Sequence, residues 1–88
     1  MSVFVVSYDL NKAGKDYAGL YSAIKSCGPW MHKLDSTWLI STQKSAEEVY
    51  NILAPHIDSD DKVLVIKADK NWHAKLDTES YDWLRKHL

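Results

Sequence analysis

The stretch that decides the fold reads Ser2-Val3-Phe4-Val5-Val6-Ser7-Tyr8-Asp9-Leu10. It is short, rich in valine and aromatic residues, and apolar at both alternating sets of positions until Ser7. This pattern is typical of a strand that is buried on both faces. We therefore expect a strand from Ser2 to Leu10. Alternation places one set of side chains toward the helices (Phe4, Val6, Tyr8) and the other set away from them (Val3, Val5, Ser7, Asp9).

Two helices are expected outward from this strand. The first follows Asp16, a plausible N-cap, and ends at Gly28-Pro29, because glycine suits a left-handed cap and proline cannot continue a helix. The second follows the capping-box pair Ser45 and Glu48. Each predicted helix carries an apolar stripe with helical spacing (Tyr17, Leu20, Tyr21, Ile24 in the first; Ala46, Val49, Tyr50, Leu53 in the second).

Three more strands are expected, over Trp30–Asp35, Thr37–Thr42 and Lys62–Ala68. The first two are joined tightly at Asp35-Ser36. Asp77 or Thr78 is expected to cap a short C-terminal helix. The order strand–helix–strand–strand–helix–strand, with right-handed crossovers, puts both long helices on one face of a sheet.

The predicted fold class is therefore α+β, a ferredoxin-like βαββαβ sandwich with a short C-terminal extension or helix, in one domain over residues 1–88. Within it we expect four residues of the third and fourth strands to share the helix-facing side with Phe4 and Val6. These residues are Trp38, Ile40, Leu64 and Ile66.

Composition limits the possible functions. Eleven Lys and Arg residues against twelve Asp and Glu give a formal charge of −1, which argues against tight non-specific binding of nucleic acid. The single cysteine, Cys27, excludes an intrachain disulfide or a thiolate metal cluster. No apolar run approaches the ~18 residues that span a bilayer, and we expect a cytoplasmic protein without a membrane partner.

The face of the first strand that points away from the helices is apolar at Val3 and Val5, and such a surface needs a cover. The C-terminal helix or a second subunit could supply it. We favour a homodimer, because the domain is small and dimers are common.

Asp9 is the first candidate for chemistry, because it ends the first strand. A carboxylate there could hold Mg²⁺ or Mn²⁺, which would activate water or stabilise a leaving oxygen in phosphodiester cleavage. The alternative is that Asp9 only accepts hydrogen bonds from the Asn11–Gly14 loop. Composition alone favours this alternative.

Two other segments carry candidate binding residues. Lys12 and Lys15, in the loop between the first strand and the first helix, could contact phosphate, although the loop lacks the phosphate-loop motif. In the late segment, cations surround an aromatic ring and could contact nucleic acid, or its tryptophan could anchor a packing or subunit interface. The residues of this segment are Lys70, Trp72, His73 and Lys75.

The element order and Val5-Val6-Ser7-Tyr8-Asp9-Leu10 resemble the small CRISPR-associated endonuclease family that supports spacer acquisition, and the virulence-associated protein D ribonucleases. The sequence resembles SinR-like small proteins related to that family still more closely, through Leu34-Asp35-Ser36-Thr37-Trp38-Leu39, Asp16-Tyr17 and Trp72. The resemblance implies a ferredoxin-like homodimer with a metal-binding Asp9. His32 and Leu34 stand where the CRISPR-associated family often has Arg and Gln.

Two functions follow as hypotheses. The first is a homodimeric, nucleic-acid-associated protein that acts as a divalent-metal-dependent endoribonuclease through Asp9. The second is a non-catalytic binding module for a nucleotide-like ligand, nucleic acid or a protein partner. The few basic residues near Asp9, namely Lys12 and Lys15, leave both hypotheses open.

Overall fold

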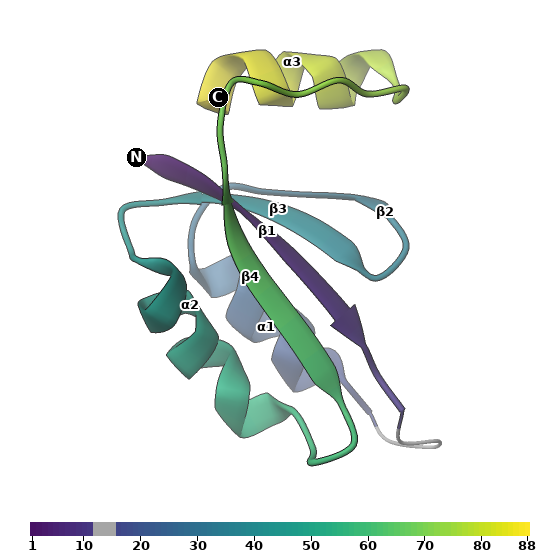
Figure 1. Cartoon of the computed structure of the whole chain (residues 1–88). Coiled ribbons are helices and arrows are strands. Elements are labelled where there is room, and N and C mark those ends of the chain that lie inside the picture. The colour runs from purple at the N-terminus through teal and green to yellow at the C-terminus, as the bar shows by residue number, and fades with distance from the viewer. Residues whose placement is uncertain (12–15) are drawn as a thin grey trace.

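The computed structural model describes residues 1–11 and 16–88. Within these residues the chain forms one four-stranded antiparallel sheet with the strand order β2-β3-β1-β4, together with three α-helices (Figure 1). The strands are β1 (Ser2–Asp9), β2 (Trp30–Leu34), β3 (Thr37–Thr42) and β4 (Lys62–Ala68). The helices are α1 (Ala18–Ser26), α2 (Ala46–Leu53), extended by a short 3₁₀ turn over Ala54–His56, and α3 (Thr78–His87). No helix among the described residues is long and apolar enough to cross a membrane.

The main core lies between the sheet and the pair α1 and α2, which pack side by side on one face (Figure 1). Phe4 and Val6 of β1 face this core, as their alternation predicted. Trp38 and Ile40 of β3 join them there, also as predicted. The helices contribute the buried side chains of Leu20, Ala23 and Ile24 from α1 and of Val49 and Leu53 from α2.

The predicted capping box of α2 is confirmed, whereas the N-cap of α1 is Tyr17 and not the predicted Asp16. Ser45 and Glu48 form the predicted capping box, in which each side chain accepts a hydrogen bond from the other residue's backbone N–H. Helix α1 begins at Ala18, two residues after Asp16, whose carboxylate accepts a hydrogen bond from the Ala18 N–H (2.9 Å). Gly28 follows α1 with φ of 151°, and a side chain there would clash with the carbonyl oxygen of Ser41.

The expected register of β4 is wrong by one residue. Leu64 and Ile66, predicted to face the helices, are 58% and 53% exposed on the other face. Val63 and Val65 pack against the core instead. A run of apolar residues as uniform as Val63-Leu64-Val65-Ile66 carries no alternation, and a shift of one residue reverses every side chain in a strand.

The C-terminal segment covers part of the outer face of the sheet. Helix α3 lies on the side opposite α1 and α2 and contacts β2 (Figure 1). Val5 and Leu39 line a small hollow together with Leu84 and Leu88 of this segment. Asp77 caps α3 by accepting a hydrogen bond from the Ser80 N–H (2.8 Å), as expected for one of the two predicted caps. The chain itself therefore supplies one of the two predicted covers.

Candidate functional site at the end of strand β1

Asp9, the last residue of β1, lies at the surface between two hollows. The larger hollow, about 460 Å³, opens toward β2 and is also lined by His32 and Asp35. The smaller, about 250 Å³, opens toward β4 beside Lys62 and Leu64. The Asp9 side chain is exposed, and its carboxylate makes no hydrogen bond or ion pair with another residue that the structure describes.

Aromatic side chains from three elements form the wall of the larger hollow. The Tyr8 hydroxyl accepts a hydrogen bond from Trp38 Nε1 (3.0 Å), and its ring lies 6.2 Å from that of Tyr21 on α1. His32 of β2 stacks on Trp38 with ring centroids 3.9 Å apart and planes 10° apart. Burial raises the pKa of Tyr8 above its usual value, although the Trp38 hydrogen bond acts in the opposite direction. Tyr8 is therefore a neutral hydroxyl at physiological pH.

The β2–β3 turn is fastened to the end of β1, and this places Asp35 near Asp9. Ser36 adopts φ of 57°, the left-handed conformation of a tight turn. Its carbonyl oxygen accepts a hydrogen bond from the Tyr8 N–H (3.1 Å). One residue further into β1 and β3, the hydroxyls of Ser7 and Thr37 lie 3.2 Å apart. Asp9 and Asp35 thus line one hollow.

Among the described residues, the Asp61 carboxylate holds the start of the chain after β1, and the Asp9 side chain takes no part. Asp61 Oδ1 accepts a hydrogen bond from the Asn11 N–H (2.8 Å), and Asp61 Oδ2 accepts one from the Asp58 N–H (2.8 Å). The Asn11 side chain donates to the Asp60 carbonyl oxygen (2.9 Å). No local pattern in the sequence marks Asp61 for this role. A buried carboxylate cannot be told from its exposed neighbours by composition alone.

None of the other predicted site residues that the structure describes lies beside Asp9. Lys12 and Lys15 lie outside the described residues. Trp72 and His73 line the small hollow under α3 on the outer face of the sheet, which fits the packing alternative for Trp72. Lys70 and Lys75 are exposed in the same segment, and neither lines a hollow beside Asp9.

The donor set beside Asp9 suits a hard cation that keeps most of its water. Magnesium is commonly held by one or two carboxylates and several waters, and Asp9 and Asp35 are such carboxylates. Over residues 1–11 and 16–88 the structure contains no group of three or more His, Cys, Asp or Glu residues arranged to hold a metal ion. A structural zinc site of the usual four-ligand type therefore does not fit these residues.

No family model matches this chain, and no solved structure gives a significant match. Function must therefore be argued from the residues around Asp9. Three of them, Tyr21, His32 and Asp35, were not predicted as site residues. They come from α1, β2 and the β2–β3 turn, and only the topology of the sheet brings them together.

Proposed function

We propose that this chain is a small nucleic-acid-associated protein that binds a divalent cation, Mg²⁺ or Mn²⁺, at Asp9 and cleaves RNA. The observation that carries the proposal is the exposed Asp9 carboxylate, which has no partner among the described residues and lies in the same hollow as Asp35. Asn11, the first residue of the loop that follows β1, donates its N–H to Asp61 and not to the Asp9 carboxylate.

The roles of the residues follow from their positions. Asp9 would hold the cation, with Asp35 as the second carboxylate of the hollow. The cation would supply a Lewis acid for the phosphodiester and lower the pKa of bound water. His32 and Tyr21, which line the same hollow, would contact the substrate beside the carboxylates.

Cleavage of labelled RNA and DNA with and without Mg²⁺ or Mn²⁺ tests this proposal. The wild type should cleave RNA only with a divalent cation, and Asp9→Asn should lose this activity by orders of magnitude, because the substitution keeps the shape but removes the charge. Asp60→Asn is the matched control, since Asp60 is exposed but lines neither hollow. Normal cleavage by Asp9→Asn would refute a catalytic role for Asp9.

A second candidate is a binding module without catalysis. It is favoured by the near-neutral charge of the chain and by the absence of a three-ligand group among the described residues. The same assay separates the two functions, because a module would bind single-stranded RNA and leave it intact under every metal condition.

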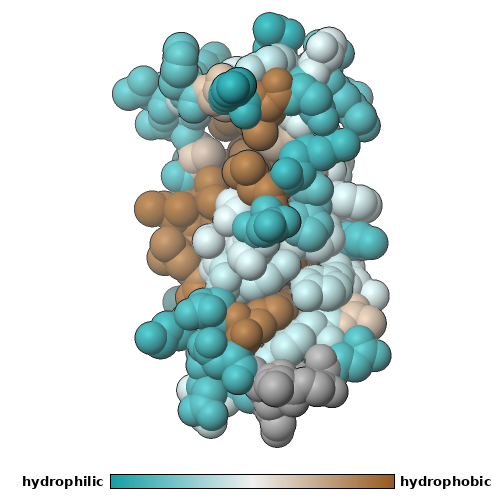
Figure 2. Space-filling model, turned by 90° about the vertical axis from the view of Figure 1, so that its right-hand side faces the viewer, coloured by the Kyte–Doolittle hydropathy of each residue, from teal (hydrophilic) through white to brown (hydrophobic). Residues whose placement is uncertain are grey.

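We further propose a ferredoxin-like fold, a homodimer and a cytoplasmic location. Two split βαβ units support the fold, since each helix connects strands that have another strand between them, and the order read from the other edge is β4-β1-β3-β2. Leu64 and Ile66 support the dimer, because they expose apolar surface on the edge strand β4. Figure 2 shows hydrophobic surface gathered along one side of the molecule.

A further inference from the structure

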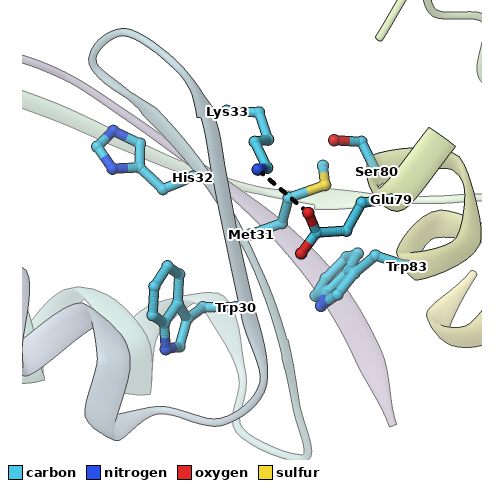
Figure 3. A pocket seen from close by; sticks show the side chains of 7 residues that line it. All are labelled: Trp30, Met31, His32, Lys33, Glu79, Ser80 and Trp83. Atoms are coloured by element: carbon cyan, nitrogen blue, oxygen red, sulfur yellow. Dashed lines mark hydrogen bonds and ion pairs between the residues drawn. The ribbon is translucent and has the colours of Figure 1, made fainter. Parts of the chain in front are cut away.

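A second hollow, about 370 Å³, lies between the edge strand β2 and helix α3 (Figure 3). This is within the size range of small-ligand sites. Successive residues of β2 point to opposite sides of the strand, with Trp30 and His32 on one side and Met31 and Lys33 on the other. The α3 residues Glu79, Ser80 and Trp83 face Met31 and Lys33 across the hollow.

The lining offers aromatic surface on both sides of β2. Trp30 is 43% exposed although its ring lies 5.3 Å from the buried Trp38. Trp83 is half-buried, and its ring lies 4.4 Å from that of His87. Tryptophan rings that are supported from behind and open in front are suited to stack a nucleobase.

Two lysine side chains, Lys33 and Lys25, lie near this hollow. Lys33 Nζ lies 3.5 Å from Glu79 Oε2 and 3.7 Å from Asp77 Oδ2, and the Glu79 side chain is 83% exposed. Ion pairs at such exposed positions are weak, so a phosphate could replace Glu79 on Lys33. Lys25 Nζ lies 4.9 Å above the Trp30 ring, on the other side of β2.

A buried hydroxyl completes the lining. Ser80 is 1% exposed. The Ser80 hydroxyl lies close enough to the Asp77 carboxyl to lower its pKa. The Ser80 Oγ nevertheless makes no hydrogen bond of good geometry with any residue that the structure describes. Ser80 therefore forms part of the buried floor of the hollow.

His32 lines both this hollow and the hollow that contains Asp9, so the two form neighbouring parts of one surface. We propose that the hollow between β2 and α3 is a base-binding subsite for single-stranded nucleic acid, which runs from Trp30 and Trp83 past His32 toward Asp9. One base stacks on Trp30 and another on Trp83, on the two sides of β2, and Lys33, on the Trp83 side, contacts an adjacent phosphate. This inference rests on the proposed association with nucleic acid, but it does not require cleavage.

Binding of a short labelled single-stranded RNA, and of DNA with the same sequence, tests the subsite in EDTA, where no cleavage takes place. Trp30→Leu and Trp83→Leu should each weaken binding about 5- to 150-fold, which corresponds to ~1–3 kcal/mol per stacked base. Trp72→Leu is the matched control, because Trp72 is also partly exposed but lies outside the hollow. Denaturation curves of each variant identify any that have lost the fold.

Two charge variants test the phosphate contact without removing a ring. Lys33→Gln should lower the magnitude of the slope of log affinity against log salt by about 0.7, the share of one phosphate on a single strand. Glu79→Gln should tighten binding, because it removes one of the two carboxylates that pair with Lys33 and so lowers the repulsion of a phosphate there. Equal binding of RNA and DNA would indicate recognition of bases and phosphates alone, and preference for RNA would add a contact to the 2′-hydroxyl.

The outcomes separate this inference from the function of Asp9. If folded Trp30→Leu and Trp83→Leu bind as tightly as Trp72→Leu, or if the wild type binds neither strand, the subsite is refuted. Loss of cleavage in Asp9→Asn together with unchanged binding by the tryptophan variants would refute the subsite and leave the nuclease in place. Binding that depends on the tryptophans without any cleavage would uphold the subsite and refute the nuclease.

Discussion

The hydroxyl of Tyr17 lies 2.8 Å from one carboxylate oxygen of Asp61 and 2.9 Å from the other, and both residues are buried. Tyr17 precedes α1, and Asp61 directly precedes β4. The same carboxylate binds the N–H of Asn11 just after β1. Since Lys62 pairs with Asp9 in the sheet, this buried carboxylate fixes the chain on both sides of the candidate site.

Tyr17→Phe should lower the free energy of unfolding by ~1–3 kcal/mol, because it removes a hydrogen bond to a buried charged group and leaves the rest of the ring in place. Urea denaturation measures the change. Tyr50→Phe is the control, since Tyr50 is 43% exposed on α2 and should change stability by no more than ~0.5 kcal/mol. Equal stability of the two variants would show that the Asp61 contact contributes little.

The register of the sheet predicts a contrast between two apolar residues. Ile40 is fully buried between β3 and the helices, so Ile40→Ala should cost ~2–5 kcal/mol. Leu64 is exposed on β4, and Leu64→Ala should cost ~0.5 kcal/mol or less in the monomer. Denaturation at low protein concentration checks both, and a large loss for Leu64→Ala with a small one for Ile40→Ala would contradict the register.

The proposed homodimer gives a different prediction for the same strand. Ile66→Glu should shift the sedimentation coefficient at high micromolar concentration from dimer to monomer, because it places a charge in the exposed apolar surface of β4. The monomeric variant should keep the unfolding midpoint of the dilute wild type. A wild type that sediments as a monomer at the same concentration would refute the dimer.

Local patterns in the sequence were sufficient for most of the fold. The alternation in β1, the capping box at Ser45 and Glu48, and the cap at Asp77 each depend on residues close together in the chain, and each is present in the structure. The register of β4 was missed because Val63–Ile66 is apolar throughout, so only its pairing with β1 determines which residues face the core.

The candidate site was predicted only where a single residue carries the signal. Asp9 stands out because it ends an apolar strand. His32 and Asp35 become its neighbours only because β3 separates β2 from β1 and the β2–β3 turn bonds back to Tyr8. Trp83 meets β2 for a similar reason, since α3 crosses to it from the far end of the chain. Such contacts depend on tertiary packing and leave no mark in local spacing.

Acid should weaken the cap of α3. The hydroxyl and the N–H of Ser80 and the nearby Lys33 hold the pKa of Asp77 below its usual value. Because the folded pKa is the lower one, the cap contributes fully above the unfolded pKa of about 3.9, and its contribution is lost as pH falls through the folded pKa. Asp77→Asn keeps a good cap but does not titrate, so its stability should fall less steeply below pH ~4. Identical pH profiles of unfolding for the two proteins would contradict this coupling.

Metal binding at Asp9 can be measured without any nucleic acid, through its effect on stability. A ligand that binds only the folded state raises stability by RT ln(1 + [L]/Kd), which is ~2.7 kcal/mol when the free ligand is at about 100 times Kd. Mg²⁺ or Mn²⁺ should therefore raise the melting temperature of the wild type in proportion to the logarithm of its concentration, and should not raise that of Asp9→Asn. Without metal, Asp9→Asn should be as stable as the wild type or slightly more stable, because the carboxylates of Asp9 and Asp35 line one hollow and repel each other.

If Asp9 instead organises the loop that follows β1, the same variants give a different pattern. Asparagine would nearly preserve the hydrogen bonds, alanine would cost ~0.5–2 kcal/mol by analogy with helix caps, and neither would change the response to metal. In the metal-binding case, Asp9→Ala and Asp9→Asn should both lose the metal response, and neither should lose much stability in EDTA. Asp60→Asn, with its carboxylate outside the hollow, should retain the full metal response. A melting temperature that rises equally with Mg²⁺ in the wild type and in Asp9→Asn would show that the cation binds elsewhere. That result would refute the proposed role of Asp9 in cleavage.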